Sequence, residues 1–140
     1  MDKPLVVRSK MTGLVAPLEY WAVPPEDMHL HVTGRCGPGK GILEKAIPEK
    51  IWGLVITKAC EIHDFMYEFG PKTEEYKQVS DNVFLSNILT LIDRNTKFGW
   101  LKWLRKREAF KYYRFVKVCG DAWFYTEDEN DGTAGTPVEF

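Results

Sequence analysis

The feature that most constrains the fold is a succession of segments whose apolar residues recur at helical spacing. The first such segment follows Pro48, which with Glu49 is favourable in the first turn of a helix. Its apolar residues recur every three or four positions, at Ile51, Val55, Ala59, Ile62 and Met66. Gly70 and Pro71 end the pattern, which predicts a helix from about Pro48 to Gly70.

Two further helices are predicted after this one. A second apolar pattern runs from about Glu74 to Asp93, and a third segment, from Phe98 to Val118, is rich in aromatic and cationic residues. The connection after Gly70 is short, which favours antiparallel packing of the first two helices. We therefore expect a mainly α fold, with two antiparallel core helices, a third basic and aromatic helix and an extended N-terminal segment.

The rest of the sequence predicts little regular structure. Residues 1–35 favour extended segments and turns, with room for one short hairpin, and residues 34–41 form a glycine-rich loop. The acidic tail over residues 126–140 is expected to be disordered. A length of 140 residues suits a single domain, which we place at residues 1–125.

Charge is unevenly distributed, although the formal net charge is only -1. The segment from Lys97 to Lys117 carries eight cationic residues and one acid, Glu108, whereas only acids follow Gly120. No signal peptide or membrane span is recognisable, so the chain is expected to be cytoplasmic as synthesised. Export by a leader-independent route, or a place in a phage or virus particle, stays open.

The polar residues of the first two helices suggest a catalytic pair. His63 and Tyr67 lie one turn apart on the same helix face, and Asp64 is about 100° away. Asp81 lies among apolar residues of the second helix, where an unpaired carboxylate is costly. If the helices are antiparallel, Asp81 can meet His63 and Tyr67 and leave one imidazole nitrogen as a general base.

The glycine-rich sequence CGPGKG, residues 36–41, could supply oxygen ligands next to Asp64. Glycine allows the conformations that point several carbonyl groups at one ion, and such hard oxygen ligands suit Ca²⁺ rather than zinc. The segment could also be an anion-binding nest, but it lacks the ending of a P-loop. A plain connecting loop is the simpler interpretation of these residues considered by themselves.

The ordered segments CGPG, ACEIHDFMY and YKQVSDNVFL resemble the phospholipase A2 family, over roughly residues 34–90. The style is most similar to the phospholipase A2 domains of parvovirus capsids and to short microbial versions. The resemblance implies a His63–Asp81 dyad that activates water and a Ca²⁺ ion held by the Asp64 side chain. It further implies loop carbonyl ligands from Arg35, Gly37 and Gly39, support of Asp81 by Tyr67 and Tyr76, and a disulfide between Cys36 and Cys60.

Several features depart from that family. The stretch from Gly41 to Cys60 is long, the usual Asp before the histidine is missing, Arg35 replaces an aromatic residue, and residues 1–35 contain no amphipathic helix. Simpler interpretations also remain: His63 as a core histidine, Asp64 as a solvated helix residue, and the two cysteines as buried thiols.

The function that these residues predict is calcium-dependent hydrolysis of phospholipid acyl esters. The third helix interleaves Trp and Tyr with Lys and Arg, which suits docking on an anionic membrane surface through Lys102, Lys106 and Lys111. The rival hypothesis is a non-catalytic module that binds anionic lipid or nucleic acid through the same helix. Under the preferred hypothesis no nucleic-acid partner is expected.

Overall fold

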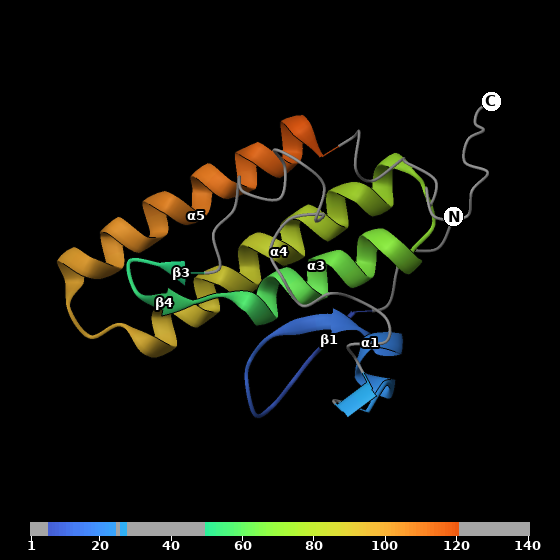
Figure 1. Cartoon of the computed structure of the whole chain (residues 1–140), viewed down its shortest axis with the longest axis horizontal. Helices are drawn as coiled ribbons and strands as arrows, with labels where there is room; N and C mark the ends of the chain where they lie inside the picture. Colours follow the sequence, from blue (N-terminus) through green and yellow to red (C-terminus); the bar gives the residue numbers. More distant parts are fainter. Residues whose placement is uncertain (1–5, 25, 28–49, 121–140) are drawn as a thin grey trace.

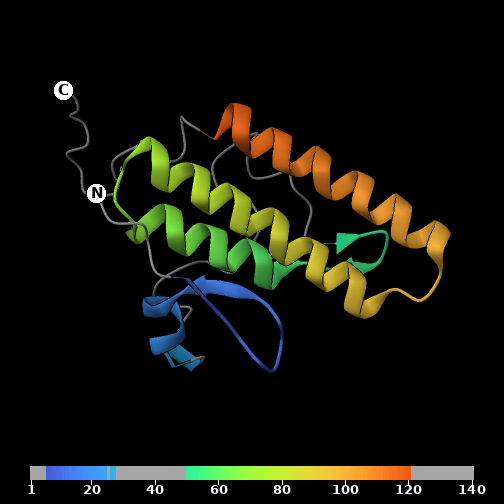
Figure 2. The same ribbon diagram turned by 180° about the vertical axis from the view of Figure 1, so that it is seen from behind.

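Three long helices dominate the described part of the chain, which in this computed structural model comprises residues 6–24, 26–27 and 50–120. They are α3 (Thr57–Phe69), α4 (Glu74–Asn95) and α5 (Gly99–Cys119). Figures 1 and 2 show α3 beside α4, and α5 running along α4 on the side away from the N-terminal strands. The fold is therefore mainly α, as the sequence predicts.

The turn between α3 and α4 sets these two helices antiparallel (Figure 1). Helix α3 ends at Phe69 and is followed by Gly70, and Thr73 caps α4 by accepting a hydrogen bond from the Tyr76 amide at 3.1 Å. Glu74 and Glu75 occupy the first turn of α4, where negative charge is favourable. The predicted second helix is thus confirmed, with its end two residues beyond Asp93.

The start of the first predicted helix is wrong, because a β-hairpin precedes α3. Strand β3 (Lys50–Ile51) pairs antiparallel with β4 (Leu54–Val55). The two residues between them, Trp52 and Gly53, have φ angles of 47° and 83°. Positive φ at both positions is characteristic of the tight turn that joins two antiparallel strands. Helix α3 consequently begins at Thr57, and Pro48 lies outside the described residues.

The N-terminal segment forms a second hairpin, followed by a short helix that the sequence did not predict. Strand β1 (Val6–Arg8) pairs with β2 (Val15–Pro17), and α1 (Leu18–Ala22) follows directly. Asn87 on α4 fixes this unit, because its side chain accepts from the Val15 amide at 2.7 Å and donates to the Val15 carbonyl at 2.8 Å. The expectation of a hairpin is confirmed, whereas the expectation of extended structure and turns alone is corrected by α1.

Apolar side chains form two clusters, one on each side of the layer made by α3 and α4. The cluster toward the N-terminal hairpin contains Leu14, Ala16, Tyr20, Ile62, Phe65, Met66, Tyr67, Tyr76 and Val83. The cluster toward α5 contains Ile51, Ile56, Ala59, Cys60, Phe84, Ile88, Ile92, Ala109 and Val116. The polar residues described next lie between these clusters. Within the described residues, none of the helices is both long and apolar enough to span a bilayer.

Candidate active site

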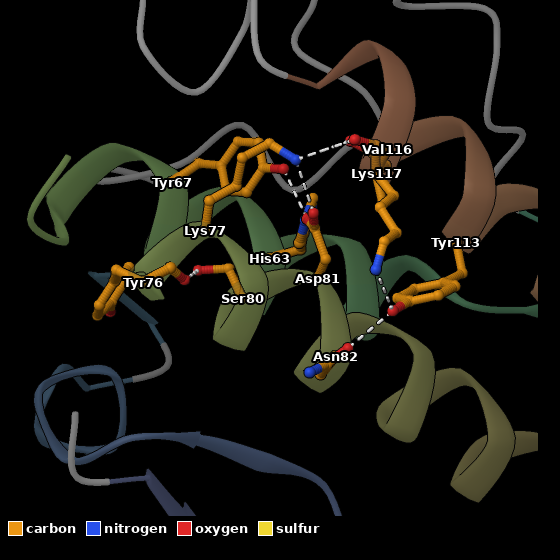
Figure 3. A network of polar contacts seen from close by, with 10 residues as sticks. All are labelled: His63, Tyr67, Tyr76, Lys77, Ser80, Asp81, Asn82, Tyr113, Val116 and Lys117. Atoms are coloured by element: carbon orange, nitrogen blue, oxygen red, sulfur yellow. Dashed lines mark hydrogen bonds and ion pairs between the residues drawn. The ribbon is translucent and has the colours of Figure 1, made fainter. Parts of the chain in front are cut away.

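A buried polar network joins α3 to α4 (Figure 3). His63 and Tyr67 lie one turn apart on α3 and both point at Asp81 of α4. The His63 Nε2 atom is 2.8 Å from Asp81 Oδ1, and the Tyr67 hydroxyl donates to the same oxygen at 2.6 Å. All three side chains are buried. The two contacts confirm the prediction from the sequence that these residues meet.

Asp81 is held in its ionised form by its neighbours. Burial would raise the pKa of this carboxyl group, because charge is poorly solvated away from water. Hydrogen bonds from His63, Lys77 and Tyr67, together with the charge of His63 when its ring is protonated, outweigh burial and lower the pKa of Asp81 below its usual range. An ionised carboxylate can only accept hydrogen bonds, so all three neighbours must act as donors.

Burial favours a neutral imidazole at His63, and the bond to Asp81 defines its tautomer. Burial lowers its pKa most strongly; Asp81 opposes this effect, and the charge of Lys77 adds to it. Because Nε2 donates to Asp81, the neutral ring has its basic lone pair on Nδ1. The rings of Tyr67 and Phe84, with centroids 4.2 and 4.6 Å away, pack against the imidazole and limit its rotation.

Lys77 is a member of this site that the sequence analysis missed. Its buried ammonium group lies 2.8 Å from Asp81 Oδ2 and donates to the Val116 carbonyl at 3.2 Å, near the end of α5. A longer contact, 3.4 Å, joins it to the Lys117 carbonyl. The signal in the sequence was the spacing, because residues four apart on a helix share a face. Lys77 therefore connects the carboxylate of the dyad to the third helix.

Tyr76, in contrast, does not support Asp81 as expected. Five residues separate the two positions, which places their side chains about 140° apart around α4. The Tyr76 side chain points away from Asp81 (Figure 3) and packs in the cluster toward the N-terminal hairpin, with its ring against Gly70. Burial, with a smaller contribution from Glu19, raises the pKa of Tyr76 to about 12. This part of the predicted site is wrong, and Lys77 occupies the role instead.

Asp64 lies beside the dyad on α3 and has an unusual environment. Its Oδ1 atom is covered from solvent and has no hydrogen-bond partner among the described residues. Burial raises the pKa of Asp64 well above its usual range, and the charges of Glu68 and Glu61 raise it further. A covered carboxylate oxygen with acidic neighbours suits a cation. Within the described ranges, however, no cluster of three or more His, Cys, Asp or Glu side chains could hold a metal.

The remaining predicted ligands and the predicted disulfide depend on residues 34–41. Arg35, Gly37 and Gly39 lie outside the described residues, as does Cys36. Cys60 is disulfide-bonded, whereas Cys119 is a free, exposed thiol.

The three lysines predicted to dock on a membrane lie on α5, next to carboxylates. Lys102 and Lys106 are 3.7 and 3.2 Å from the same oxygen of Asp93, and Lys111 is 3.4 Å from Glu108. All these groups are exposed or half-exposed, so each ion pair is weak. The pairing reduces the positive charge that these lysines can offer to an anionic surface.

No family model, curated protein or solved structure matches the chain. What the site can do chemically is therefore inferred from its own contacts. A neutral His63 hydrogen-bonded to an ionised Asp81 has the arrangement that a general base requires, because the adjacent negative charge would stabilise the protonated imidazole.

Proposed function

We propose that this protein is a calcium-dependent hydrolase of phospholipid acyl esters, similar in mechanism to phospholipase A2. The observation that carries the proposal is the buried hydrogen bond of 2.8 Å between His63 and Asp81, on antiparallel helices. Asp64, the next residue on α3, supports it with a covered carboxylate oxygen that has no hydrogen-bond partner among the described residues. The resemblance in sequence over residues 34–90 adds the substrate class.

In the proposed reaction, Nδ1 of His63 removes a proton from a water molecule. The water oxygen forms a bond to the acyl carbonyl carbon, and the carbonyl oxygen takes the negative charge of the tetrahedral intermediate. Asp81 stays ionised and stabilises the imidazolium ion that has formed. The intermediate then expels the alcohol oxygen of the lysophospholipid, which takes the proton from His63, and the fatty acid leaves as the second product.

Asp64 is the described residue that would hold calcium. Its covered oxygen and acidic neighbours fit a doubly charged cation with hard oxygen ligands. The resemblance implies that carbonyl groups of Arg35, Gly37 and Gly39 complete the ligand set. When bound, calcium supplies positive charge for the substrate phosphate and for the developing oxyanion.

Most phospholipids are located in bilayers, so the proposal includes adsorption of the protein to an anionic membrane surface through α5. Lys102, Lys106 and Lys111 contribute to it, although nearby carboxylates moderate their charge.

A second candidate function is a non-catalytic binding module. Exposed Trp100 and Trp103 lie beside the cationic residues of α5, and this observation would suit a protein whose purpose is binding alone. Lipid binding that survives both calcium chelation and substitution of His63, in a protein without hydrolytic activity, would favour it.

Hydrolysis of a soluble short-chain phosphatidylcholine tests the proposal. Fatty-acid release should require calcium and stop in excess chelator. His63→Gln, which removes the base and roughly keeps the volume, should lower the turnover number about 10²- to 10⁴-fold. Thermal unfolding of each variant shows whether it has folded. Release that continues undiminished in chelator, or a folded His63→Gln variant within about tenfold of wild type, would contradict the proposal.

A further inference from the structure

One end of the molecule exposes a group of large aromatic side chains, which we call the aromatic end. It consists of Trp52 at the tip of the β3–β4 hairpin, Phe98 directly before α5, and Trp100 and Trp103 in the first turns of α5. Figures 1 and 2 both place this hairpin and the α4–α5 turn at the same end of the helices. The exposed fraction is 56% for Trp52, 60% for Phe98, 65% for Trp100 and 61% for Trp103.

Trp52 is exposed at a backbone position that does not favour it. Its φ angle of 47° is rare for a bulky residue, and hairpin turns of this kind prefer Asn or Asp followed by Gly. Gly53 meets the preference at the second position, whereas Trp52 departs from it at the first. Residues that break a local rule without a gain in packing are often retained for function. The indole, facing solvent, makes little contribution to the core.

Arg105 holds the aromatic end together. Its buried guanidinium donates to the Trp52 carbonyl at 2.7 Å and to the Thr96 hydroxyl, also at 2.7 Å. One side chain thus joins the hairpin tip to the α4–α5 connection. The rings of Phe98 and Trp100 stack with centroids 6.4 Å apart, and the Arg107 guanidinium lies 5.4 Å from the centre of the Trp103 ring. The aromatic side chains are therefore presented on a braced platform.

The charge around the aromatic end is positive. From residue 94 to residue 107 the chain contains no acidic residue and six cationic ones: Arg94, Lys97, Lys102, Arg105, Lys106 and Arg107. Asp93 offsets Lys102 and Lys106, and Arg105 is buried, so the exposed cations left at this end are few. Binding to nucleic acid depends chiefly on many phosphate contacts, which this end does not offer. Exposed tryptophans flanked by a few cations are instead typical of the headgroup layer of a membrane.

We propose that the aromatic end anchors the protein in the headgroup layer of a phospholipid bilayer that contains anionic lipid. The anchor deepens the proposed function and rests on it for the choice of a phospholipid surface. The anchor lies far along α5 from the proposed catalytic pair. Lys77, which pairs with Asp81, meets α5 at Val116, thirteen residues or about 20 Å along the helix from Trp103. Anchoring and chemistry can therefore be measured separately.

The test measures binding to vesicles of equimolar ether-linked phosphatidylcholine and phosphatidylglycerol, which lack the acyl ester and cannot be hydrolysed. Trp52→Asn suits the turn, so it should keep or raise the unfolding temperature while it weakens vesicle binding. We expect the affinity for vesicles to fall about tenfold. A loss of this size corresponds to the burial of roughly a third of the surface of one indole ring in the membrane. Trp103→Gln should cause a similar loss, and the double variant about a hundredfold, if the two sites act independently.

Met11→Asn is the matched control. Met11 is 87% exposed near the turn of the other hairpin, and its carbonyl also accepts from a helix arginine, Arg94, at 3.0 Å. This variant should bind vesicles as wild type does, and hydrolysis of soluble short-chain substrate should be unchanged in every variant.

The anchor is overturned if wild type does not bind these vesicles, or if folded Trp52→Asn and Trp103→Gln bind as tightly as Met11→Asn. It is also overturned if the two tryptophan variants lose affinity for single-stranded nucleic acid or for a second copy of the chain, but not for vesicles. Vesicle binding that depends on the tryptophans, in a protein that hydrolyses nothing, would support the anchor and refute the hydrolase.

Discussion

Lys77 allows the site to be perturbed without touching the proposed base. Its ammonium group is buried between Asp81 Oδ2, at 2.8 Å, and the Val116 and Lys117 carbonyl groups near the end of α5. Lys77→Met keeps an unbranched side chain of similar length and removes the charge and the donors. Asp81 would keep its bonds to His63 and Tyr67 but lose its cationic partner.

The expected loss of stability follows from the burial of the ion pair. At 2.8 Å and an effective dielectric constant of about 20, the attraction between the two charges is about 6 kcal/mol, and desolvation offsets much of it. Removing one partner of a buried pair costs about 3–5 kcal/mol, because the other charge stays buried. For a chain of this size the unfolding temperature should fall by about 10–20 °C.

The pH dependence gives a second readout, which a merely structural lysine would not change. The charge of Lys77 lowers the pKa of His63, so its removal should raise that pKa and shift the acid limb of the hydrolysis rate to higher pH. Lys77 also helps to lower the pKa of Asp81, and a carboxyl group with a lowered pKa contributes stability that is lost as the pH falls through that pKa. The stability difference between wild type and Lys77→Met should therefore shrink at acidic pH.

Lys58→Met is the matched control for these measurements. Lys58 lies 3.2 Å from Glu61 on the surface of α3, and such an exposed pair is worth at most about 1 kcal/mol. Thermal unfolding followed by circular dichroism, and rates of short-chain hydrolysis between acidic and neutral pH, would be compared for the two variants. The reasoning is refuted if Lys77→Met melts no earlier than Lys58→Met and its acid limb stays in place.

Two further predictions concern the other neighbours of the dyad. Without calcium, Asp64→Asn should raise the unfolding temperature at neutral pH, because burial and the charges of Glu68 and Glu61 disfavour the ionised carboxyl group. Calcium should raise the unfolding temperature of wild type but not that of this variant. An equal effect of calcium on both proteins would contradict the assignment of Asp64 as a ligand. Tyr67→Phe should lower the free energy of unfolding, measured in urea, by about 1.5–3 kcal/mol, because it removes a hydrogen bond of 2.6 Å to an ionised group. A loss below about 0.5 kcal/mol would mean that Asp81 does not depend on this hydrogen bond.

Much of the helical framework could be predicted from the sequence, for reasons that the structure makes plain. Helix α4 has a local start signal in Thr73 and the acids after it, and its apolar pattern is long. The start of α3 was misplaced because Ile51 and Val55 are four residues apart, which suits a helix, yet they lie on the two strands of a hairpin. The turn signal was weak, since tryptophan takes the position where asparagine is usual.

The site was predictable where helical spacing brings residues to one face and unpredictable where burial alone decides. His63, Tyr67 and Asp81 follow from spacing and antiparallel packing. Lys77 shares the face of Asp81, but a lysine in a helix is usually solvated, and its burial depends on α5 covering it. Tyr76 was assigned by resemblance to the family, against the helical geometry that places it on another face.

The α3–α4 hairpin also has a consequence for the order of folding. The bonds that join His63 and Tyr67 to Asp81 close loops of only 18 and 14 residues, whereas the bonds from α4 to the N-terminal unit span 72 and 83 residues. Short loops close with less loss of chain entropy, and structure built from local contacts forms faster. The contacts of the dyad should therefore form early, before the N-terminal strands find α4. In kinetic terms, the proposed catalytic pair lies in the part of the chain that can form its contacts with the least help from the rest.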